Sequence, residues 1–531
     1  MPIIRHSKSV TGVSPCRNDL EMEDGQGEWP FTGHFVSITE LSATDPLYQP
    51  MTVTIETLPD HPLLEIFSLY MEEVGGLPEF LIEGRIDTWH TLVHVCQRWR
   101  SLVFALSHRL NLRILCTNTR PLREILDLWP ALPIVIWCKE IKLTEIPPMP
   151  MVGAENIVSA LGHRDRVSQI SFLGLPLSIF SRFTAIMDAS FPVLTHLKLD
   201  PYGDDGQEAI LEDSFLGGSA PCLRSLRLHR VTFPALHKLL LSTKDLVDLC
   251  LVNIPFSDYV SPEGMASCLS SLTKLEDLRL GFSPLAFYPD RNQHLPLTRV
   301  DLCHLIRLHF GGTTKYLEDF VARINAPLLR IFQMLLIGPV LLNTPQLTDF
   351  VDRAEPFKVL DQAELHFHDY DVTVKLLSQK ETVDRTILNV HSGLPRSEGS
   401  FLSLEQARSS FLSLISSVEC LNLTEDEYWP LISQGIVENA YWLQLLRPFT
   451  AVKHLYLSGE PGLQVARTLH ELTWEGVVEV WPALQSVFLE GLQPSEDVVD
   501  AIAPFIVRRQ LSGHPVTVHS WDGKELMVDM L

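Results

Sequence analysis

The sequence predicts an α/β chain, with a short helical region near the N-terminus followed by a long, irregular solenoid of one strand and one helix per repeat. Two stripes of apolar residues at helical spacing between residues 58 and 106 predict the first part. Beyond residue 137, a six-residue pattern, apolar-x-x-apolar-x-apolar, recurs to the end of the chain and predicts the second. We therefore expect a disordered tail over residues 1–50, a helical domain with a linker helix over 51–137, and a repeat domain with a C-terminal cap over 138–531.

Composition supports a folded chain and excludes some partners. The 531 residues are too many for one compact core at about 150 residues per domain, and 46% of them are hydrophobic, so most of the chain can bury a core. Asp and Glu number 65 against 42 Lys and Arg, a net charge of -23 that repels phosphate backbones and anionic lipid. We expect neither nucleic acid nor a membrane as a partner.

Cysteine usage and hydropathy predict the compartment. The nine cysteines are odd in number and never form a Cys-x-x-Cys pair, as in proteins with reduced thiols. Residues 1–30 contain no apolar stretch long enough for a signal peptide. The apolar run Leu328 to Leu342 is interrupted by polar residues and is shorter than the roughly 20 residues of a membrane span. We expect a cytoplasmic or nuclear protein.

The helical domain is predicted from caps and spacing. Asp60 can cap a helix and Pro62 fits its first turn, and an apolar stripe follows at Leu63, Ile66, Phe67 and Tyr70. After a link rich in glycine, a second stripe predicts another helix, with Leu92, Val95, Cys96, Trp99, Val103 and Leu106 on one face. A linker helix over 121–128 and a buried strand over 132–137 are expected next.

The repeat domain is predicted from the six-residue pattern. It is clearest in LTHLKL (from residue 194), LRSLRL (223), LEDLRL (275), VKHLYL (452) and LQSVFL (484). Weaker matches begin at Cys138, Val167, Leu246, Leu297, Leu328, Leu360, Arg385 and Val418. The mean spacing is about 29 residues, within the range of leucine-rich repeats, and proline precedes several windows, where it suits the first residue of a strand.

Helix-like stretches between the windows complete the strand-plus-helix unit, at residues 177–189, 235–242, 316–324 and 404–416. The Asn or Cys that usually follows the last strand leucine is missing, so we expect an irregular array. A helix over 495–510 and a strand over 515–521 are expected to cap its end.

A motif within the helical domain resembles the F-box. The stretch LPDHPLLEIF (58–67) followed by VCQRWRSL (95–102) carries Leu-Pro, Leu-x-x-Ile-Phe and Val-Cys-x-x-Trp. With WHTLVH (89–94) and WPALPI (129–134), the chain is most similar to fungal F-box proteins with C-terminal leucine-rich repeats. The resemblance covers about eighty residues, and the remainder only as repeat architecture.

This resemblance implies a substrate-recognition subunit of a Skp-cullin-F-box (cullin-RING) ubiquitin ligase. The helices would bind the Skp adaptor and through it the cullin, the repeats would hold a protein substrate, and the chain itself would be no enzyme. Apolar stripes on a small helical segment gain stability in a partner's groove, and the expected adaptor contacts are Leu58, Pro59, Leu63, Ile66, Phe67, Val95, Trp99 and Val103. Alternatively, these residues pack only against each other and the first repeat.

Two departures from the motif favour another hypothesis. His61 stands where the motif usually has an acid, and about twenty residues separate Tyr70 from Thr91. The alternative function is a leucine-rich-repeat scaffold or interaction protein that works outside ubiquitination.

The side chains between the strand leucines are candidates for substrate binding, because alternate strand residues point to the face without helices. They are His196, Lys198, Arg224, Arg227, Glu276, Arg279, His454 and Tyr456. For each one, an ordinary solvated side chain is the simpler interpretation.

No motif in the sequence supports catalysis or a cofactor. His366 and His368 would share one strand face, but no further Cys or His group accompanies them as zinc sites require. The chain has no Gly-x-Ser-x-Gly elbow and no Gly-rich loop ending in Lys-Ser or Lys-Thr. We expect no catalytic residue, no metal and no cofactor.

Overall fold

The structure is a computed structural model. It describes residues 55–73, 89–118, 126, 129, 131–139, 151–203, 209–254, 261–282, 298–337, 344–368, 371–378, 386–392, 411–425, 442–443, 446–472, 480–490 and 496–521. The predicted tail, the link after residue 73 and nearly all of the predicted linker helix lie outside these residues. The chain divides into two units, Met1–Pro62 and Leu63–Leu531.

The helical region contains the short helix η1 (Ile55–Thr57) and the helices α1 (Asp60–Glu73), α2 (Trp89–Val93) and α3 (Gln97–Ala105). The helix predicted at Asp60 is confirmed. The second stripe was expected to be one helix, but it is divided, because Cys96 has an extended backbone and its Sγ accepts the N–H of Trp99 at 3.5 Å as the cap of α3. A cap at this position starts a new helix.

Helix α1 packs on α3 through aromatic residues. Leu63 and Phe67 are buried, and the Phe67 ring lies 4.7 Å from the Trp99 ring. Trp89 of α2 is fully buried and donates from Nε1 to the Arg113 carbonyl at 2.9 Å. A buried indole with a satisfied N–H is typical of a well-formed core.

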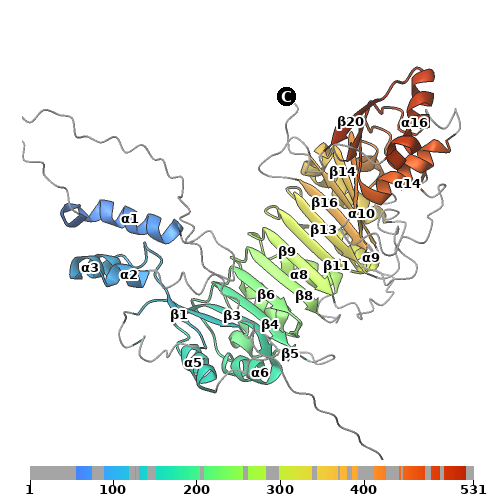
Figure 1. Ribbon diagram of the computed structural model, residues 1–531. Coiled ribbons are helices and arrows are strands. Elements are labelled where there is room, and N and C mark those ends of the chain that lie inside the picture. The colour runs from blue at the N-terminus through green and yellow to red at the C-terminus, as the bar shows by residue number, and fades with distance from the viewer. Residues whose placement is uncertain are drawn as a thin grey trace, which may run out of the picture. The chain divides into compact units, whose positions relative to one another are not determined.

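A sixteen-stranded sheet dominates the rest of the described chain (Figure 1). Its first part is parallel, with β1 (Ile114–Cys116), β2 (Ile134–Lys139), β3 (Val167–Pro176), β4 (His196–Tyr202), β6 (Ser225–His229), β8 (Asp248–Ile254), β9 (Asp277–Phe282), β11 (Arg307–Gly312) and β13 (Ile331–Leu336). The order continues with β16 (Ile387–Ser392), β15 (Asp371–Leu377), β14 (Gln362–His368), β17 (Cys420–Glu425), β18 (His454–Leu457), β19 (Ser486–Glu490) and β20 (Thr517–Trp521).

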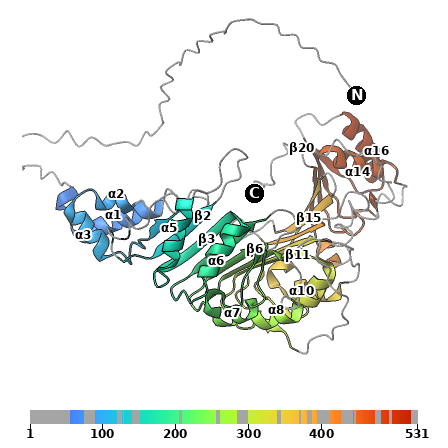
Figure 2. The same cartoon turned by 90° about the horizontal axis from the view of Figure 1, so that it is seen from below.

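Shorter strands and helices join these strands. Two small sheets pair β5 (Ala209–Ile210) with β7 (Val231–Thr232) and β10 (Val300–Asp301) with β12 (Ile324–Asn325). The helical elements are α5 (Met151–Leu161), α6 (Leu177–Ile186), η3 (Phe215–Gly218), α7 (Leu236–Ser242), α8 (Pro262–Leu269), α9 (Thr314–Val321), α10 (Pro345–Arg353), η5 (Glu355–Val359), α12 (Leu412–Ile415), α14 (Gly459–His470) and α16 (Glu496–Leu511). Figure 2 shows α7, α8 and α10 on one side of the strands.

Leucines on neighbouring strands form the core under the helices. Leu197, Leu226, Leu249 and Leu278 are paired from strand to strand, and each is at most 1% exposed. Because successive strand residues point to opposite faces, the leucines cover the helix side and the residues between them cover the other. The chain is thus mixed α/β with a long, mostly parallel sheet, which is compatible with a solenoid-like class.

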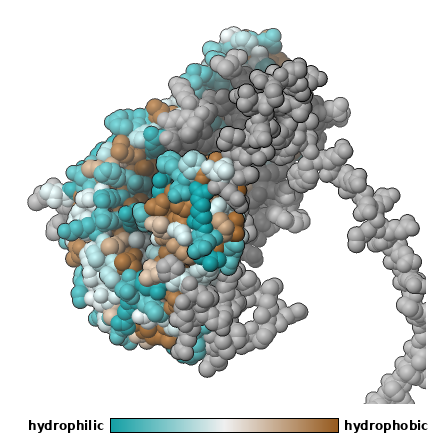
Figure 3. Space-filling model, turned by 90° about the vertical axis from the view of Figure 1, so that its left-hand side faces the viewer, coloured by the Kyte–Doolittle hydropathy of each residue, from teal (hydrophilic) through white to brown (hydrophobic). Residues whose placement is uncertain are grey.

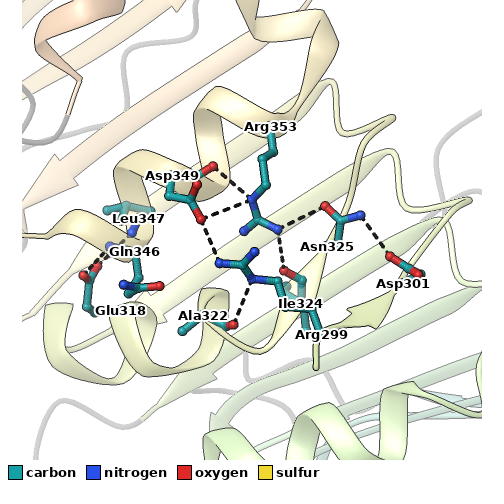
Figure 4. A network of polar contacts seen from close by, with 10 residues as sticks. All are labelled: Arg299, Asp301, Glu318, Ala322, Ile324, Asn325, Gln346, Leu347, Asp349 and Arg353. Atoms are coloured by element: carbon teal, nitrogen blue, oxygen red, sulfur yellow. Dashed lines mark hydrogen bonds and ion pairs between the residues drawn. The ribbon is translucent and has the colours of Figure 1, made fainter. Parts of the chain in front are cut away.

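Neighbouring helices are also linked by polar contacts (Figure 4). Glu318 on α9 is 8% exposed and accepts the backbone N–H groups of Gln346 and Leu347, at 2.7 and 2.9 Å. It therefore caps the next helix, α10, because the first N–H groups of a helix have no partner within that helix. Burial raises the pKa of Glu318, although these two hydrogen bonds lower it. Asp349 of α10 binds both Arg299 and Arg353.

Most predicted windows coincide with strands of the sheet, but two were misplaced. The window at Leu297 was wrong: residues 300–301 pair in a small separate sheet, and the sheet strand is β11, which comes from LIRLHF at 305. The window at Leu328 was one residue early, because Leu328 is 55% exposed and Leu329 is buried. Leu328 and Leu329 are both apolar, so the pattern could begin at either residue. A shift of one residue moves every side chain of the strand to the opposite face.

The other strands and helices differ in detail from the sequence predictions. The predicted strand over 132–137 is β2 (Ile134–Lys139), and the window at Cys138 begins at its end, with residues 140–143 outside the described residues. Strands β1 and β15 were not predicted. Helix α9 begins at Thr314 and ends before Ile324, which belongs to β12. The predicted closing helix and strand are confirmed as α16 and β20, and β20 pairs with β19 at the end of the sheet order.

Strand β15 interrupts the parallel order. It pairs antiparallel with β14 and with β16, while β16 pairs parallel with β13 and β17 pairs parallel with β14. The chain therefore leaves β13, forms β14 three positions away, and returns through β15 to place β16 beside β13. A simple stack of repeats would instead add each strand next to the previous one.

Candidate functional site

Helix α1 carries an apolar stripe that faces away from its core. Ile66, Leu69 and Tyr70 are 42%, 64% and 39% exposed, and their spacing of three and four residues places them on one face. We call these three residues the α1 stripe. On the face drawn in Figure 3, hydrophobic residues form small groups surrounded by hydrophilic ones, as is normal for a protein surface. The α1 stripe is distinguished by its spacing on one helix.

The predicted adaptor contacts range from fully buried to exposed. Leu63, Phe67 and Val103 are at most 1% exposed, so they support the helices from within. Ile66 and Val95 are exposed, by 42% and 58%, and can meet a partner directly. Leu58 and Trp99 are half-buried and Pro59 is exposed.

Sequence reasoning missed Leu69, the most exposed member of the stripe. The signal was its spacing of three residues from Ile66, which places both on one helix face. Tyr70 was assigned to the apolar face, and its hydroxyl lies 3.3 Å from the Thr91 Oγ1, near the start of the second helical segment.

The sheet has an open face, which we define as the face opposite the helices. On β6, half-buried Ser225, Arg227 and His229 point to this face and alternate with buried Leu226 and Leu228. Neighbouring strands repeat the alternation, so polar side chains form rows across the open face.

The predicted substrate contacts are distributed unevenly over this face. Alternation places His196, Lys198, Arg227, Arg279 and His454 on the open face. Tyr456 is also on this side but is only 4% exposed; it stacks on Phe488 at 4.3 Å, and burial raises its pKa to about 12. Arg224 and Glu276 precede β6 and β9, and their carbonyls accept N–H groups of the next strand. Arg224 is exposed and Glu276 is half-buried, so of the eight predicted contacts only Tyr456 is nearly closed to solvent.

Charges on the open face are arranged in close pairs. Asp277 is 4% exposed and lies 3.0 Å from the Arg279 Nη2 and 2.9 Å from the Arg307 Nε. Burial would raise the pKa of Asp277, but the hydrogen bonds and charges of the two arginines outweigh it and lower this pKa. On the neighbouring strand, Asp248 accepts from the Arg227 Nε at 2.6 Å. The acids are thus neutralised, and arginine nitrogen remains partly exposed.

One pocket lies where the open face begins, over β2, β3, β4 and β6. We call it the Trp137 pocket. Its volume is about 460 Å³, and it is lined by apolar Val135, Trp137 and Leu173 and by the cations of Lys139, Lys198 and Arg227, with His196 at one side. Leu115, Val135 and Trp137 form a buried cluster against which Leu173 packs. Aromatic and basic groups therefore meet in one hollow.

A second depression lies over β9 and β11, with a volume of about 340 Å³. Gly281 and Gly311 are paired on the two strands and leave a gap in the layer of side chains. An added Cβ would have neighbours no closer than 3.4 Å at Gly281 and 3.6 Å at Gly311, so the gap has room for a methyl group.

His366, Cys116 and Cys420 have contacts or burial that bear on ligand binding and reactivity. The described residues contain no group of three or more His, Cys, Asp or Glu side chains arranged to hold a metal ion. His366 instead contacts Glu364 at 3.3 Å and Thr424 at 2.7 Å. Burial raises the pKa of Cys116 to about 12 and that of Cys420 to about 11, so both thiols are protonated and poorly nucleophilic at neutral pH.

The chain matches no model of a known protein family, and no curated protein is similar to it in sequence. Among the helices that the structure describes, none combines the length and the apolar character required to cross a bilayer.

Proposed function

We propose that this protein is the substrate-recognition subunit of a Skp-cullin-F-box ubiquitin ligase. The helical region would bind the Skp adaptor, and the open face of the sheet would hold a protein substrate. We also propose that the sheet is an irregular array of leucine-rich repeats that follows an F-box. The proposal rests on the motif at residues 58–102 and on the recurring strand pattern.

The α1 stripe is the observation that carries this proposal. Leu63 and Phe67 already bury the inner face of α1 and Tyr70 contacts Thr91, so Ile66 and Leu69 are the members of the stripe that remain most exposed. Burying one large apolar side chain in a partner contributes about 1.5–3 kcal/mol, which favours a groove-binding interaction over solvent exposure. Val95, which belongs to the motif and is 58% exposed, provides a further apolar contact.

Co-purification with the host's Skp adaptor tests the proposal. The full chain should retain the adaptor, and Ile66→Glu combined with Leu69→Glu should abolish this, because the charges would enter an apolar interface. Leu328→Glu is the control for an added surface charge, since Leu328 is 55% exposed in the sheet region, and it should retain the adaptor. Absence of adaptor from the unaltered chain, or equal retention by the double variant, would contradict the proposal.

The alternative, a scaffold that acts outside ubiquitination, is favoured by one observation. Three of the eight residues expected to contact the adaptor are buried, namely Leu63, Phe67 and Val103. These positions would then serve only the packing of the helices. Adaptor-dependent ubiquitination of a protein bound to the sheet separates the hypotheses, because a scaffold would bind that protein without causing its modification.

A further inference from the structure

We infer that the Trp137 pocket binds an acidic segment of the substrate protein. One apolar side chain of that segment would lie against Trp137 and Leu173, and its carboxylates would lie beside Lys139, Lys198 and Arg227. The inference rests on the proposed function, because it names the class of substrate that the open face receives.

Charge complementarity is the first argument. Among the residues that the structure describes, the pocket lining includes three cations and no carboxylate. Asp248 lies on the neighbouring strand and holds the Arg227 guanidinium at 2.6 Å. The whole chain carries a net charge of -23, so a basic pocket is a local exception that attracts acidic partners.

Further cations lie close to the pocket. Burial lowers the pKa of His196, and the positive charges of Arg113 and Arg224 lower it further. His196 therefore lies within the electrostatic reach of two arginines that the lining itself does not include. At neutral pH this histidine is uncharged, and its ring contacts Gln169 at 3.2 Å and Thr195 at 2.9 Å. The positive potential comes from lysine and arginine.

The apolar part of the pocket gives the second argument. Trp137 is 7% exposed and packs with Leu115 and Val135, so its ring is a fixed surface. Pockets of about 300–1,000 Å³ with apolar walls and a few polar groups are typical binding sites, and this one has about 460 Å³. An apolar side chain buried there would provide affinity, while the cations would select an acidic surrounding sequence.

A peptide fits these features better than a nucleic acid does. Nucleic acid binding depends on many phosphate contacts along a basic surface, and the chain as a whole repels phosphate. A short acidic peptide with one apolar residue requires only the pocket.

Fluorescence anisotropy with the full chain and no adaptor tests the inference. The probe is a labelled ten-residue peptide with six Glu or Asp residues around a central Phe. Lys139→Glu combined with Lys198→Glu should weaken its binding by about tenfold or more, since like charges would then face each other. Lys358→Glu, at an exposed lysine of η5, makes half of this charge change away from the pocket and should leave binding within about twofold.

Two further changes, one in the peptide and one in the protein, measure the apolar contribution to binding. Replacing the central Phe of the peptide by Ser should weaken binding, and Leu173→Ala should do the same for the Phe peptide. Equal binding of a peptide with Lys in place of the acids, tighter binding of a single-stranded oligonucleotide, or no effect of the double lysine variant would overturn the inference. Circular dichroism of each variant checks that the fold is retained. Because the adaptor is absent, these results do not depend on the adaptor-binding test.

Discussion

At the residue scale, Asp277 shows how the open face combines stability with positive charge. Its carboxylate is almost fully buried between two arginines that are each about 40% exposed. A buried carboxylate needs such partners, because removing it from water is costly. The arrangement leaves two guanidinium groups partly in solvent, where they are able to contact a ligand.

Asp277→Asn should lower the free energy of unfolding at pH 7 by about 1–3 kcal/mol, the usual contribution of hydrogen bonds to a charged group. The pKa of Asp277 is below its ordinary value of 3.8, so its stabilising effect is present above pH 3.8 and is lost as the pH falls through the lower folded value. Urea unfolding at pH 7 and at pH 3 measures this difference, which should shrink in acid. Asp245→Asn is the control, because Asp245 is exposed and should change little. An equal difference at both pH values would contradict this account.

At the element scale, strand β11 shows how one strand serves two faces. It ends with two glycines, of which Gly311 faces the open side and Gly312 the helix side. A Cβ at Gly311 would have its nearest neighbour at 3.6 Å, whereas a Cβ at Gly312 would meet the rings of Phe310 and Phe282 at 2.9 and 3.0 Å. Both rings belong to packed strands and cannot move without disturbing the core.

These two glycines make a matched pair of substitutions. Gly312→Ala should lower the free energy of unfolding by about 1–3 kcal/mol, the usual cost of overpacking a core. Gly311→Ala should change it by less than about 1 kcal/mol, because the methyl group enters open space. Chemical unfolding of both variants measures the contrast. A similar effect of the two substitutions would mean that β11 does not separate a packed face from an open one.

The local sequence of each element decides whether that element could be predicted. Strands such as β4, β6 and β9 were predicted because each carries leucines that alternate with polar residues. The break between α2 and α3 was not predicted, since Cys96 is an uncommon capping residue.

At the scale of the whole molecule, the sequence predicted the succession of strands and helices but not the order of every strand. Only two residues connect β14 to β15, and parallel neighbours need a connection of about a dozen residues or more. That short link was a sign of a hairpin, but the window at Arg385 was counted as the next parallel repeat. The six-residue apolar pattern predicts which residues face the core, but it does not predict which strands are neighbours in the sheet.

The sequence also predicted the candidate sites only in part. The motif led to α1, but spacing on the helix and exposure were needed to separate buried Leu63 and Phe67 from exposed Ile66 and Leu69. The Trp137 pocket joins strands from β2 to β6, which are far apart in sequence. No local pattern reveals such a site, because it depends on the register between strands.

Hydrogen–deuterium exchange of the full chain, with and without the Skp adaptor, tests the central claim most directly. Adaptor binding should slow exchange in α1 (60–73) and α3 (97–105), because covering the α1 stripe and Val95 would stabilise both helices. Exchange in β9 should stay unchanged and serves as the internal reference. An adaptor that leaves exchange in α1 and α3 unchanged at saturating concentration would contradict the claim that these helices form its docking site.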